Sequence, residues 1–371
     1  MHQVYKSFPY ARTMATIIGA GPCGLLAAWK LAEKGVPCHV YEEHAQVGNP
    51  VQCTGLLTSR ISSIMKLHSE IILNRIREAR IISGRTKLEL PIDDLVIDRA
   101  AFDRHMAELA AGAGAELKLG RRVDSRFLQE IKRSDKDKVL IGADGPDSMV
   151  RKQLNPKVKV PYLVGRQAVV SGSFEPERFD VYIGEKVCPG FFAWCVPESN
   201  STARVGLASA KDTAGLFNRF FKRLRKEHHG TELKVRAEQG GLIPLYTPKL
   251  CTEKDDTFLL GDAATQVKAT TGGGLVPGMR AAHVLARCIL DCKSYERSWR
   301  KAIGSELRTH LYIRNALDRF RDKDYEGLLE MLSQDRLRRL FREKTRDDSL
   351  GLALGILARE PRLLRFALKA L

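Results

Sequence analysis

The fold is decided by the stretch Ala15-Thr-Ile-Ile-Gly19-Ala-Gly21-Pro-Cys-Gly24, in which a short apolar run ends in a glycine-rich turn. A helical pattern follows over 25–33, and a second apolar run at 37–41 leads into Glu42, eighteen residues after Gly24. A strand, a helix and a second strand in this order, with glycines at the first turn and a carboxylate after the second strand, predict the β-α-β unit that binds dinucleotides.

Each residue of this motif has a physical task. Gly19, Gly21 and Gly24 permit a tight turn and let a pyrophosphate approach the amides at the N-terminus of the helix. Glu42 is expected to accept hydrogen bonds from the ribose hydroxyls, and we assign Glu43 to the same site. The motif does not distinguish FAD from NAD, and a glycine-rich turn without a ligand is the alternative interpretation.

The length and charge of the chain restrict the classes of protein to which it can belong. A chain of 371 residues with 44% hydrophobic residues buries a substantial core and suggests two or three structural units. The net charge of +17 favours acidic partners such as phosphates, anionic membranes or nucleic acid. Nucleic acid is disfavoured because no nucleic-acid motif accompanies the charge. The basic residues concentrate late in the chain, at 219–226 and at Arg336, Arg338, Arg339, Arg342, Lys344 and Arg346.

The cysteine pattern indicates whether metal sites or disulfides are expected, and the length of the apolar runs indicates whether the chain can span a membrane. None of the eight cysteines forms a C-x-x-C pair, so we expect no metal site and no disulfide framework. Without a recognisable signal peptide, the reducing cytoplasm is the expected compartment. The longest apolar run, 350–358, is much shorter than the roughly 20 residues that span a bilayer. Residues 1–13 are set aside as an extension that precedes the first strand.

The order of patterns along the chain predicts a nucleotide domain that is interrupted and later completed. Apolar strand patterns recur at 138–142 and 257–260, and a helix is expected over 275–290. Between them, 160–250 alternates as an antiparallel sheet does. We therefore expect a discontinuous nucleotide-binding domain at 14–60, 96–150 and 255–292, a substrate domain at 61–95 and 151–254, and a helical region at 293–371.

Two further motifs specify the cofactor. They are Ile141-Gly-Ala-Asp144-Gly145-Pro-Asp-Ser148 with Arg151, and Leu260-Gly261-Asp262-Ala-Ala264, and the second is followed by Thr271-Gly272-Gly273-Gly274. Together with the first motif they resemble the FAD-dependent hydroxylase and geranylgeranyl reductase superfamily. The resemblance covers about residues 14–290. It implies an α/β fold with a glutathione-reductase-like (GR2) Rossmann FAD-binding domain, an inserted antiparallel β-sheet substrate domain and C-terminal helices, with FAD as the cofactor.

In that superfamily the first segment packs near the pyrophosphate, and the second supplies an aspartate to the ribityl side. The resemblance therefore assigns Asp144 and Gly145 to the pyrophosphate region. Asp262 is expected to accept a hydrogen bond from a ribityl hydroxyl. The glycines leave amides bare at the start of the helix at Leu275, where a positive helix end stabilises the anion of reduced flavin. This set comprises Gly272, Gly273, Gly274 and Leu275.

A narrower resemblance, to geranylgeranyl reductases, comes from Gly48-Asn-Pro-Val-Gln-Cys53-Thr54-Gly55. In that family this segment places a cysteine beside the flavin ring, which implies a catalytic position for Cys53 and cofactor contacts for all three of Cys53, Thr54 and Gly55. Arg99 matches a further family position near the cofactor, and Val123 is assigned to the same site. A buried packing role for Cys53 and a solvated helix start for Arg99 are the alternatives.

The segment Pro189-Gly-Phe-Phe192-Ala-Trp194-Cys-Val196-Pro197 is similar to the Y-x-W-x-F-P strand that lines the isoprenoid pocket of this family. Phe192 and Val196 depart from the pattern but keep the wall apolar, and burial of each CH₂ of a polyprenyl chain contributes about 0.8 kcal/mol. The resemblance assigns Phe192 and Trp194 to the reacting site, with ordinary core packing as the alternative. Ala269 stands where the family often has proline.

The resemblance implies that reduced FAD transfers hydride to a double bond of a geranylgeranyl chain, carried on a diphosphate or on an archaeal-type ether phospholipid. The reductant is left open between NAD(P)H and a protein carrier of the ferredoxin type. The alternative functions are a flavin monooxygenase acting on an aromatic or quinone substrate, an electron carrier to membrane quinone, and a lipid-binding protein with an inactive flavin site. A halogenase is disfavoured because the sequence lacks W-x-W-x-I-P.

The C-terminal stretch 361–371 places Arg362, Arg365 and Lys369 on one helical stripe and leaves the other faces apolar. This pattern suggests peripheral attachment to an anionic membrane surface, on the inner face of the membrane. Packing against the chain's own helices or against a partner subunit is the alternative.

Overall fold

The computed structural model describes residues 14–133, 138–228, 232–337, 340, 351, 355–356, 358–367 and 369. Its strands are β1 (Met14–Ile18), β2 (Cys38–Tyr41), β3 (Leu56–Thr58), β4 (Ile72–Ser83), β5 (Thr86–Ile97), β6 (Glu116–Lys118), β7 (Lys138–Gly142), β8 (Tyr162–Ser171), β9 (Arg178–Ile183), β10 (Phe192–Pro197), β11 (Thr202–Ser209), β12 (Lys234–Pro244), β13 (Glu253–Lys254) and β14 (Thr257–Leu259).

The α-helices are α1 (Pro22–Ala32), α2 (Arg99–Gly112), α3 (Ser125–Arg133), α4 (Met149–Leu154), α5 (Thr213–Glu227), α6 (Leu275–Asp291), α7 (Tyr295–Trp299), α8 (Ser305–Leu317), α9 (Asp322–Leu332) and α12 (Leu364–Ala367). Short 3₁₀ turns lie at η1 (Ser59–Ser63), η2 (Ser69–Ile71), η3 (Gly261–Ala264) and η5 (Pro361–Leu363). A π-helical turn, η4 (Arg300–Gly304), links α7 to α8.

The first sheet has six strands in the order β13-β14-β7-β1-β2-β6. All neighbouring pairs are parallel except β13 with β14. Helix α1 connects β1 to β2 and packs against α2 and α6. Because helices cover a parallel sheet, its strands read as continuous apolar runs, which is why the sequence revealed them. The predicted β-α-β unit is confirmed, with the helix beginning at Pro22, where a proline is favoured.

The second sheet has eight strands in the order β12-β8-β11-β10-β9-β4-β5-β3. Its pairs are antiparallel except β4 with β9, which is parallel. The antiparallel sheet expected for 160–250 is confirmed for β8 to β12, and the parallel pair joins that region to β4, which lies outside it. After β5 the chain leaves to build much of the first sheet and returns before β9, and such a long crossover allows two strands to lie parallel. The α/β fold class is confirmed, and the predicted domain boundaries stay predictions.

Helix α5 lies inside the region that the sequence pattern assigned to strands alone. Its buried residues are Leu216, Phe217, Phe220, Phe221 and Leu224, spaced as one face of a helix. The side chain of Asp212 accepts a hydrogen bond from the Gly215 amide and caps the helix. The interpretation of 160–250 as strands throughout is therefore wrong here, because a helical period interrupts the alternation.

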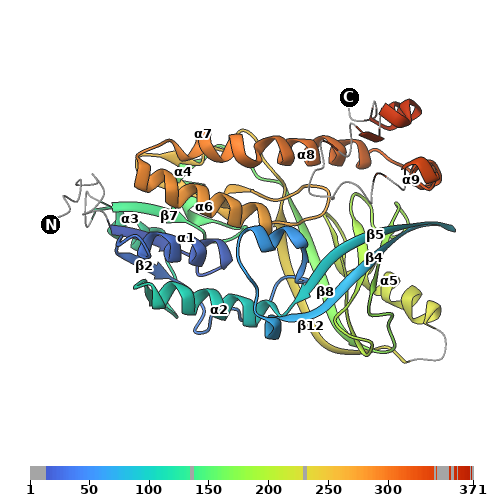
Figure 1. Ribbon diagram of the computed structural model, residues 1–371, viewed down its shortest axis with the longest axis horizontal. Coiled ribbons are helices and arrows are strands. Elements are labelled where there is room, and N and C mark those ends of the chain that lie inside the picture. The colour runs from blue at the N-terminus through green and yellow to red at the C-terminus, as the bar shows by residue number, and fades with distance from the viewer. Residues whose placement is uncertain are drawn as a thin grey trace, which may run out of the picture.

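The two sheets meet beneath a layer of later helices. Figure 1 shows α6, α7 and α8 (orange) along the top, α1 and α2 on the side of the first sheet, and the β4–β5 hairpin reaching away from it. Helix α9 packs against β4 and β5. Tyr295, Trp299, Ile303 and Leu307 belong to the same core cluster as β1 and α1, so the start of the C-terminal region completes the first core.

The described part of the C-terminal segment packs on the chain itself. Leu363 and Phe366 are buried in a cluster with Phe320 and Tyr325, and Lys369 pairs with Asp324 at 2.6 Å. Arg338, Arg339, Arg342, Lys344 and Arg346 of the late basic run lie outside the described residues. Within the described part of the chain, no helix is both long and apolar enough to cross a bilayer. Membrane attachment through this segment stays a prediction.

Candidate functional site

One cavity of about 1310 Å³ runs between the two sheets and beneath α8 and α9. It is larger than the roughly 300–1,000 Å³ of a typical pocket for a small ligand, which leaves room for two ligands side by side. Of the sequence-predicted site residues, all but Gly24 line it: Gly19, Gly21, Glu42, Glu43, Cys53, Thr54, Gly55, Arg99, Val123, Asp144, Gly145, Phe192, Trp194, Asp262, Gly272, Gly273, Gly274 and Leu275.

The glycines of the first turn do different physical work. A Cβ at Gly19, where φ is +103°, would lie 2.3 Å from the Ala143 oxygen, and one at Gly24 would lie 2.2 Å from the Gly19 oxygen. These two glycines allow the strand, the helix and the loop after β7 to approach each other. A Cβ at Gly21 would meet nothing within 4 Å. Gly21 therefore borders open space in which a phosphate could reach the helix N-terminus.

Glu42 lies at the end of β2, beside the glycine turn. One of its oxygens accepts a hydrogen bond from the Ala20 amide at 2.8 Å, and the other accepts from the His44 amide at 3.0 Å. A carboxylate has further lone pairs, so Glu42 remains able to accept from a ribose hydroxyl. Glu43 is half exposed and pairs with Arg122 at 3.6 Å, and Val123 closes the same end of the cavity.

Asp144 acts mainly on its own loop. Its carboxylate accepts hydrogen bonds from the Ser148 hydroxyl at 2.5 Å and from the Met149 amide at 2.7 Å, which fixes the start of α4. The buried Arg151 donates to the Pro146 oxygen at 2.6 Å and to the Ala263 oxygen at 3.3 Å. Arg151 thereby holds the loop after β7 against the Gly-Asp-Ala-Ala turn, a bridge that spacing in the sequence did not indicate.

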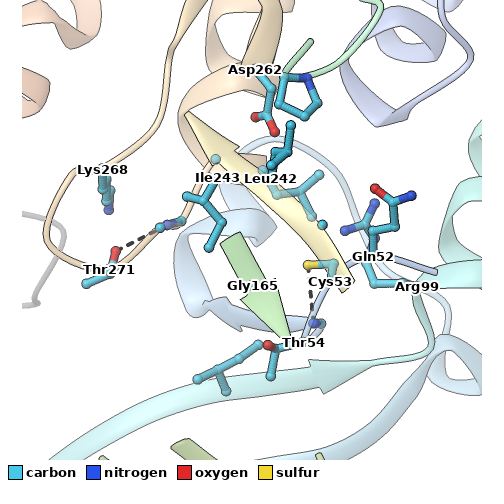
Figure 2. A pocket seen from close by; sticks show the side chains of 18 of the residues that line it. Gln52, Cys53, Thr54, Arg99, Gly165, Leu242, Ile243, Asp262, Lys268 and Thr271 are labelled. Atoms are coloured by element: carbon cyan, nitrogen blue, oxygen red, sulfur yellow. Dashed lines mark hydrogen bonds between the residues drawn. The ribbon is translucent and has the colours of Figure 1, made fainter. Parts of the chain in front are cut away.

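Asp262 projects into the cavity from η3, as Figure 2 shows. Burial raises the pKa of its carboxyl to about 6, although the charges of Arg99 and Arg151 oppose the rise. A Cβ at Gly274 would come within 2.8 Å of an Asp262 oxygen, so the glycine makes room for this carboxylate. Among the described residues no side chain caps α6 at Gly274, and the amides of Leu275 and Val276 in its first turn are left for a ligand, since Pro277 has no amide hydrogen.

The segment that carries Cys53 is fixed by the second sheet. Arg204 of β11 is buried, pairs with Glu198 and donates to the Cys53 carbonyl oxygen at 2.5 Å. Thr54 donates from its hydroxyl to Gln167 of β8 at 3.0 Å. Gln167 in turn donates to Gln239 of β12 at 2.6 Å. Gln167 and Gln239 form a polar patch on the cavity wall. The sequence did not predict this patch, because single glutamines in strands belong to no recognisable motif.

The thiol of Cys53 lies among polar groups. Its Sγ accepts a hydrogen bond from the Gly55 amide at 3.4 Å, and Figure 2 shows it beside Gln52 and Arg99. Arg99 donates to the Asp103 carboxylate at 3.1 Å. Burial disfavours the charge of Arg99, but the neighbouring Cys53 and Asp103 outweigh it and raise the pKa of the guanidinium. A positive charge is thus held beside Cys53.

Strand β10 presents an apolar face to the cavity. Phe192, Trp194 and Val196 alternate along the strand and all line the cavity, as the two-residue period of a strand requires. Phe192 stacks on Phe191 with ring centroids 4.2 Å apart, and Trp194 meets Phe192 edge-on. Val181 and Ile183 of β9 and apolar residues of α9 continue this wall: Tyr325, Leu328, Leu329 and Leu332.

Three basic residues in the wall were missed by reasoning from the sequence. Lys268 pairs with Glu306 at 3.1 Å, and His310 shares a hydrogen bond of 2.5 Å with the Thr270 hydroxyl. His310 and Arg314 lie one turn apart on α8, and both line the cavity. The i, i+4 spacing of His310 and Arg314 could have indicated that they share one face of a helix. This helix is rich in charged residues and lies outside the segment that the motifs cover, so the spacing did not stand out.

The fold and this site define a Rossmann-type oxidoreductase. Residues 17–53 match the family model of the NAD(P)-binding Rossmann-like domain. The chain is 28% identical to digeranylgeranylglycerophospholipid reductase of Methanothrix thermoacetophila, over 87% of this chain and 92% of that protein. The resemblance to geranylgeranyl reductases that the motifs indicated is confirmed.

Two solved structures show the same fold. A geranylgeranyl bacteriochlorophyll reductase-like protein of Thermoplasma acidophilum has a TM-score of 0.79 at 18% identity, covering 96% of this chain and 99% of that chain. A triple mutant of the flavin-dependent brominase Bmp2 has a TM-score of 0.69 at 16% identity, covering 93% and 99%. At these identities the likeness shows the fold alone.

Proposed function

We propose that this protein is an FAD-dependent reductase that saturates double bonds of geranylgeranyl chains. The observation that carries the proposal is the continuity of one cavity, which joins the dinucleotide turn and Asp262 to the apolar wall of β10. The similarity to digeranylgeranylglycerophospholipid reductases over most of the chain supports the same substrate class. A flavin monooxygenase acting on a lipophilic substrate remains the second candidate, because a probable FAD-dependent monooxygenase of Pseudomonas aeruginosa shares the fold.

The residues present fit FAD. Open space at Gly21 would receive the pyrophosphate, and Glu42 would accept from the ribose of the adenosine half. Asp262 would accept from the ribityl chain, and no described residue donates a hydrogen bond to its carboxylate. The uncapped amides of α6, reached past Gly272–Gly274, would face the pyrimidine edge. A bare dinucleotide of the NAD type would leave Asp262 without a role.

Bound reduced flavin supplies the hydride for such a reduction. The protein's own residues hold and shape the reacting groups. The α6 amides favour negative charge on the ring. Phe192 and Trp194 hold the isoprenoid chain by apolar contact and exclude water from the reacting carbons. Cys53, whose carbonyl oxygen accepts a hydrogen bond from Arg204, would lie against the ring of the bound flavin.

The substrate is a geranylgeranyl chain on a diphosphate or on an ether phospholipid. Among the described residues the first sheet carries one glycine-rich nucleotide turn, and FAD would occupy it. The electron donor therefore binds without such a turn of its own, and it is NAD(P)H or a ferredoxin-type protein. We place the protein in the cytoplasm, with contact to the inner face of the membrane through which its lipid substrate is reached.

Mass analysis of the purified protein tests this proposal. We expect a yellow protein that releases FAD on denaturation. With dithionite as reductant, a geranylgeranyl substrate should gain two hydrogen atoms for each double bond saturated. In a parallel aerobic assay with NAD(P)H in place of dithionite, which consumes oxygen, incorporation of oxygen without saturation would favour the monooxygenase instead. A colourless protein that binds added lipid but no flavin would leave only a lipid-binding role.

A further inference from the structure

Arg314 is a buried cation in the apolar half of the cavity. It extends from α8, is 5% exposed, and lines the cavity with Phe191 and Tyr325. The guanidinium carbon lies 5.2 Å from the ring centre of Phe191. This position is costly for a charge, because an ion removed from water is stabilised only by partners that fully satisfy it.

The partners of Arg314 in the described chain do not satisfy it. Its Nε lies 2.7 Å from an Asp318 oxygen, which gives an ion pair, but Asp318 is itself 40% exposed. Neither Nε nor Nη1 makes a hydrogen bond of acceptable geometry with any described residue, although both atoms are buried. A guanidinium has five N–H donors in a planar fork that matches two oxygens of a phosphate or carboxylate. The N–H groups on Nε and Nη1 of Arg314 are therefore available to bind an anion.

The surroundings of Arg314 indicate which anion it would bind. One turn before it, His310 lines the same cavity, and Gly190 lies close enough that a Cβ there would be 3.6 Å from Nη2. The next wall residues are the apolar Leu317, Phe191 and Phe192. A ligand held here would combine one anionic group with a long hydrocarbon chain. A free phosphate or a sugar phosphate would leave the apolar wall uncovered.

We propose that Arg314 binds the phosphate of the isoprenoid substrate and so sets its register in the cavity. The proposal rests on the proposed function and adds a headgroup site to it. With the phosphate held at α8, the chain follows Phe192 and Trp194 toward Asp262 and Cys53, and the distance from the phosphate selects the double bond that reaches the reacting site. Asp318 is the ionic partner that holds the guanidinium until the phosphate arrives.

Binding of two saturated analogues to the FAD-loaded full-length protein tests the site without requiring turnover. Phytanyl phosphate and phytanol share one hydrocarbon chain and differ by the phosphate alone. Their dissociation constants are measured by calorimetry for the unchanged protein and for Arg314→Met, Arg314→Lys and Asp318→Asn. Arg308→Met, at an exposed position of the same helix, is the matched control for loss of one positive charge.

We expect the unchanged protein to bind phytanyl phosphate at least about tenfold more tightly than phytanol, the size expected of a buried charge-assisted hydrogen bond. Arg314→Met should remove this preference and leave the affinity for phytanol unchanged, while Arg308→Met keeps it. Arg314→Lys should keep part of it, and Asp318→Asn should increase it. Inorganic phosphate should not displace phytanyl phosphate at equal concentration.

The outcomes separate failure of the site from failure of the function. A preference that survives in Arg314→Met, or equal affinity of the unchanged protein for both analogues, would overturn the headgroup site while leaving the lipid cavity in place. Binding of neither analogue would overturn the proposed function itself. If Arg314→Met fails to fold, a preference that is reduced but retained in Arg314→Lys and increased in Asp318→Asn supports the site, and an unchanged preference in both variants overturns it.

Discussion

Alanine at Gly24 should destabilise the protein, whereas alanine at Gly21, three residues earlier in the same turn, should leave the fold intact and reduce its flavin content. Gly24 lies within α1, where alanine is ordinarily favoured over glycine by about 1 kcal/mol. A loss of stability there would therefore report the local clash and not helix propensity. Gly21 has φ −72° and ψ 169°, a conformation that alanine adopts without strain.

The structure sets the size of the two effects. The added Cβ at position 24 would lie 2.2 Å from the Gly19 oxygen, whereas ordinary contact begins at 3.4 Å. Backbone atoms on both sides would have to separate by about 1.2 Å, and overpacking of this kind costs about 1–3 kcal/mol. We expect the flavin-free Gly24→Ala protein to unfold at a temperature lower by about 1–4 °C, because the unfolding entropy of a chain of 371 residues is large. Gly21→Ala should unfold at the original temperature or slightly above it.

Thermal unfolding of the flavin-stripped proteins, paired with flavin content as purified, measures both effects. Gly21→Ala should lose at least half of its FAD because the new methyl group occupies the space where the pyrophosphate approaches the amides. Equal destabilisation by the two substitutions would refute the reasoning, since it would mean that the space beside Gly21 is not open. Full flavin content in Gly21→Ala would place the pyrophosphate elsewhere.

The affinity for FAD should rise as the pH increases through about 6, because Asp262 then ionises and accepts a hydrogen bond from a ribityl hydroxyl. Measuring FAD binding by fluorescence from about pH 5 to about pH 7 checks this. The folded pKa of Asp262 lies above the ordinary value, so the flavin-free chain should also lose stability as the pH rises through about 6, and Asp262→Asn should abolish both dependences. Cys53→Ala should retain FAD but slow or alter double-bond reduction, measured with dithionite as reductant. Unchanged turnover would mean that the Cys53 thiol only packs in the structure and takes no part in the reaction. If 361–369 attaches to membranes, Arg362→Ser with Arg365→Ser should weaken flotation with anionic vesicles about thirtyfold, at about 1 kcal/mol per residue, and unchanged flotation would exclude the segment as the anchor.

The first half of the site could be predicted from sequence because its chemistry is local. The glycine turn, Glu42 and the Asp262 turn each lie within a few residues of a strand end, where short-range spacing decides geometry. The strand at Phe192 and Trp194 was visible for the same reason. Physical proximity then follows from the parallel sheet, which gathers the strand ends at one edge.

The second half depends on contacts between segments distant in sequence. Arg204 reaches Cys53 across 151 positions, and Arg151 reaches Ala263 across 112. Nothing in the local pattern marks Arg204 as different from an ordinary strand charge, and the motif that contains Arg151 does not indicate that it reaches the Gly-Asp-Ala-Ala turn. Helix α5 was missed because its phenylalanines also suit a strand, and only the spacing of its buried face separates the two.

The order of strands in the first sheet has a consequence for synthesis of the protein. Strands β1 and β2 find their sheet neighbours β6 and β7 by residue 142, whereas β7 waits for β14 and α1 waits for α6, both made after residue 250. Strand β4 likewise waits for β9. A chain emerging from the ribosome therefore carries one unpaired edge of β7 and one uncovered face of α1 until residues beyond 250 have been made, and its folding rate should be limited by these distant pairings.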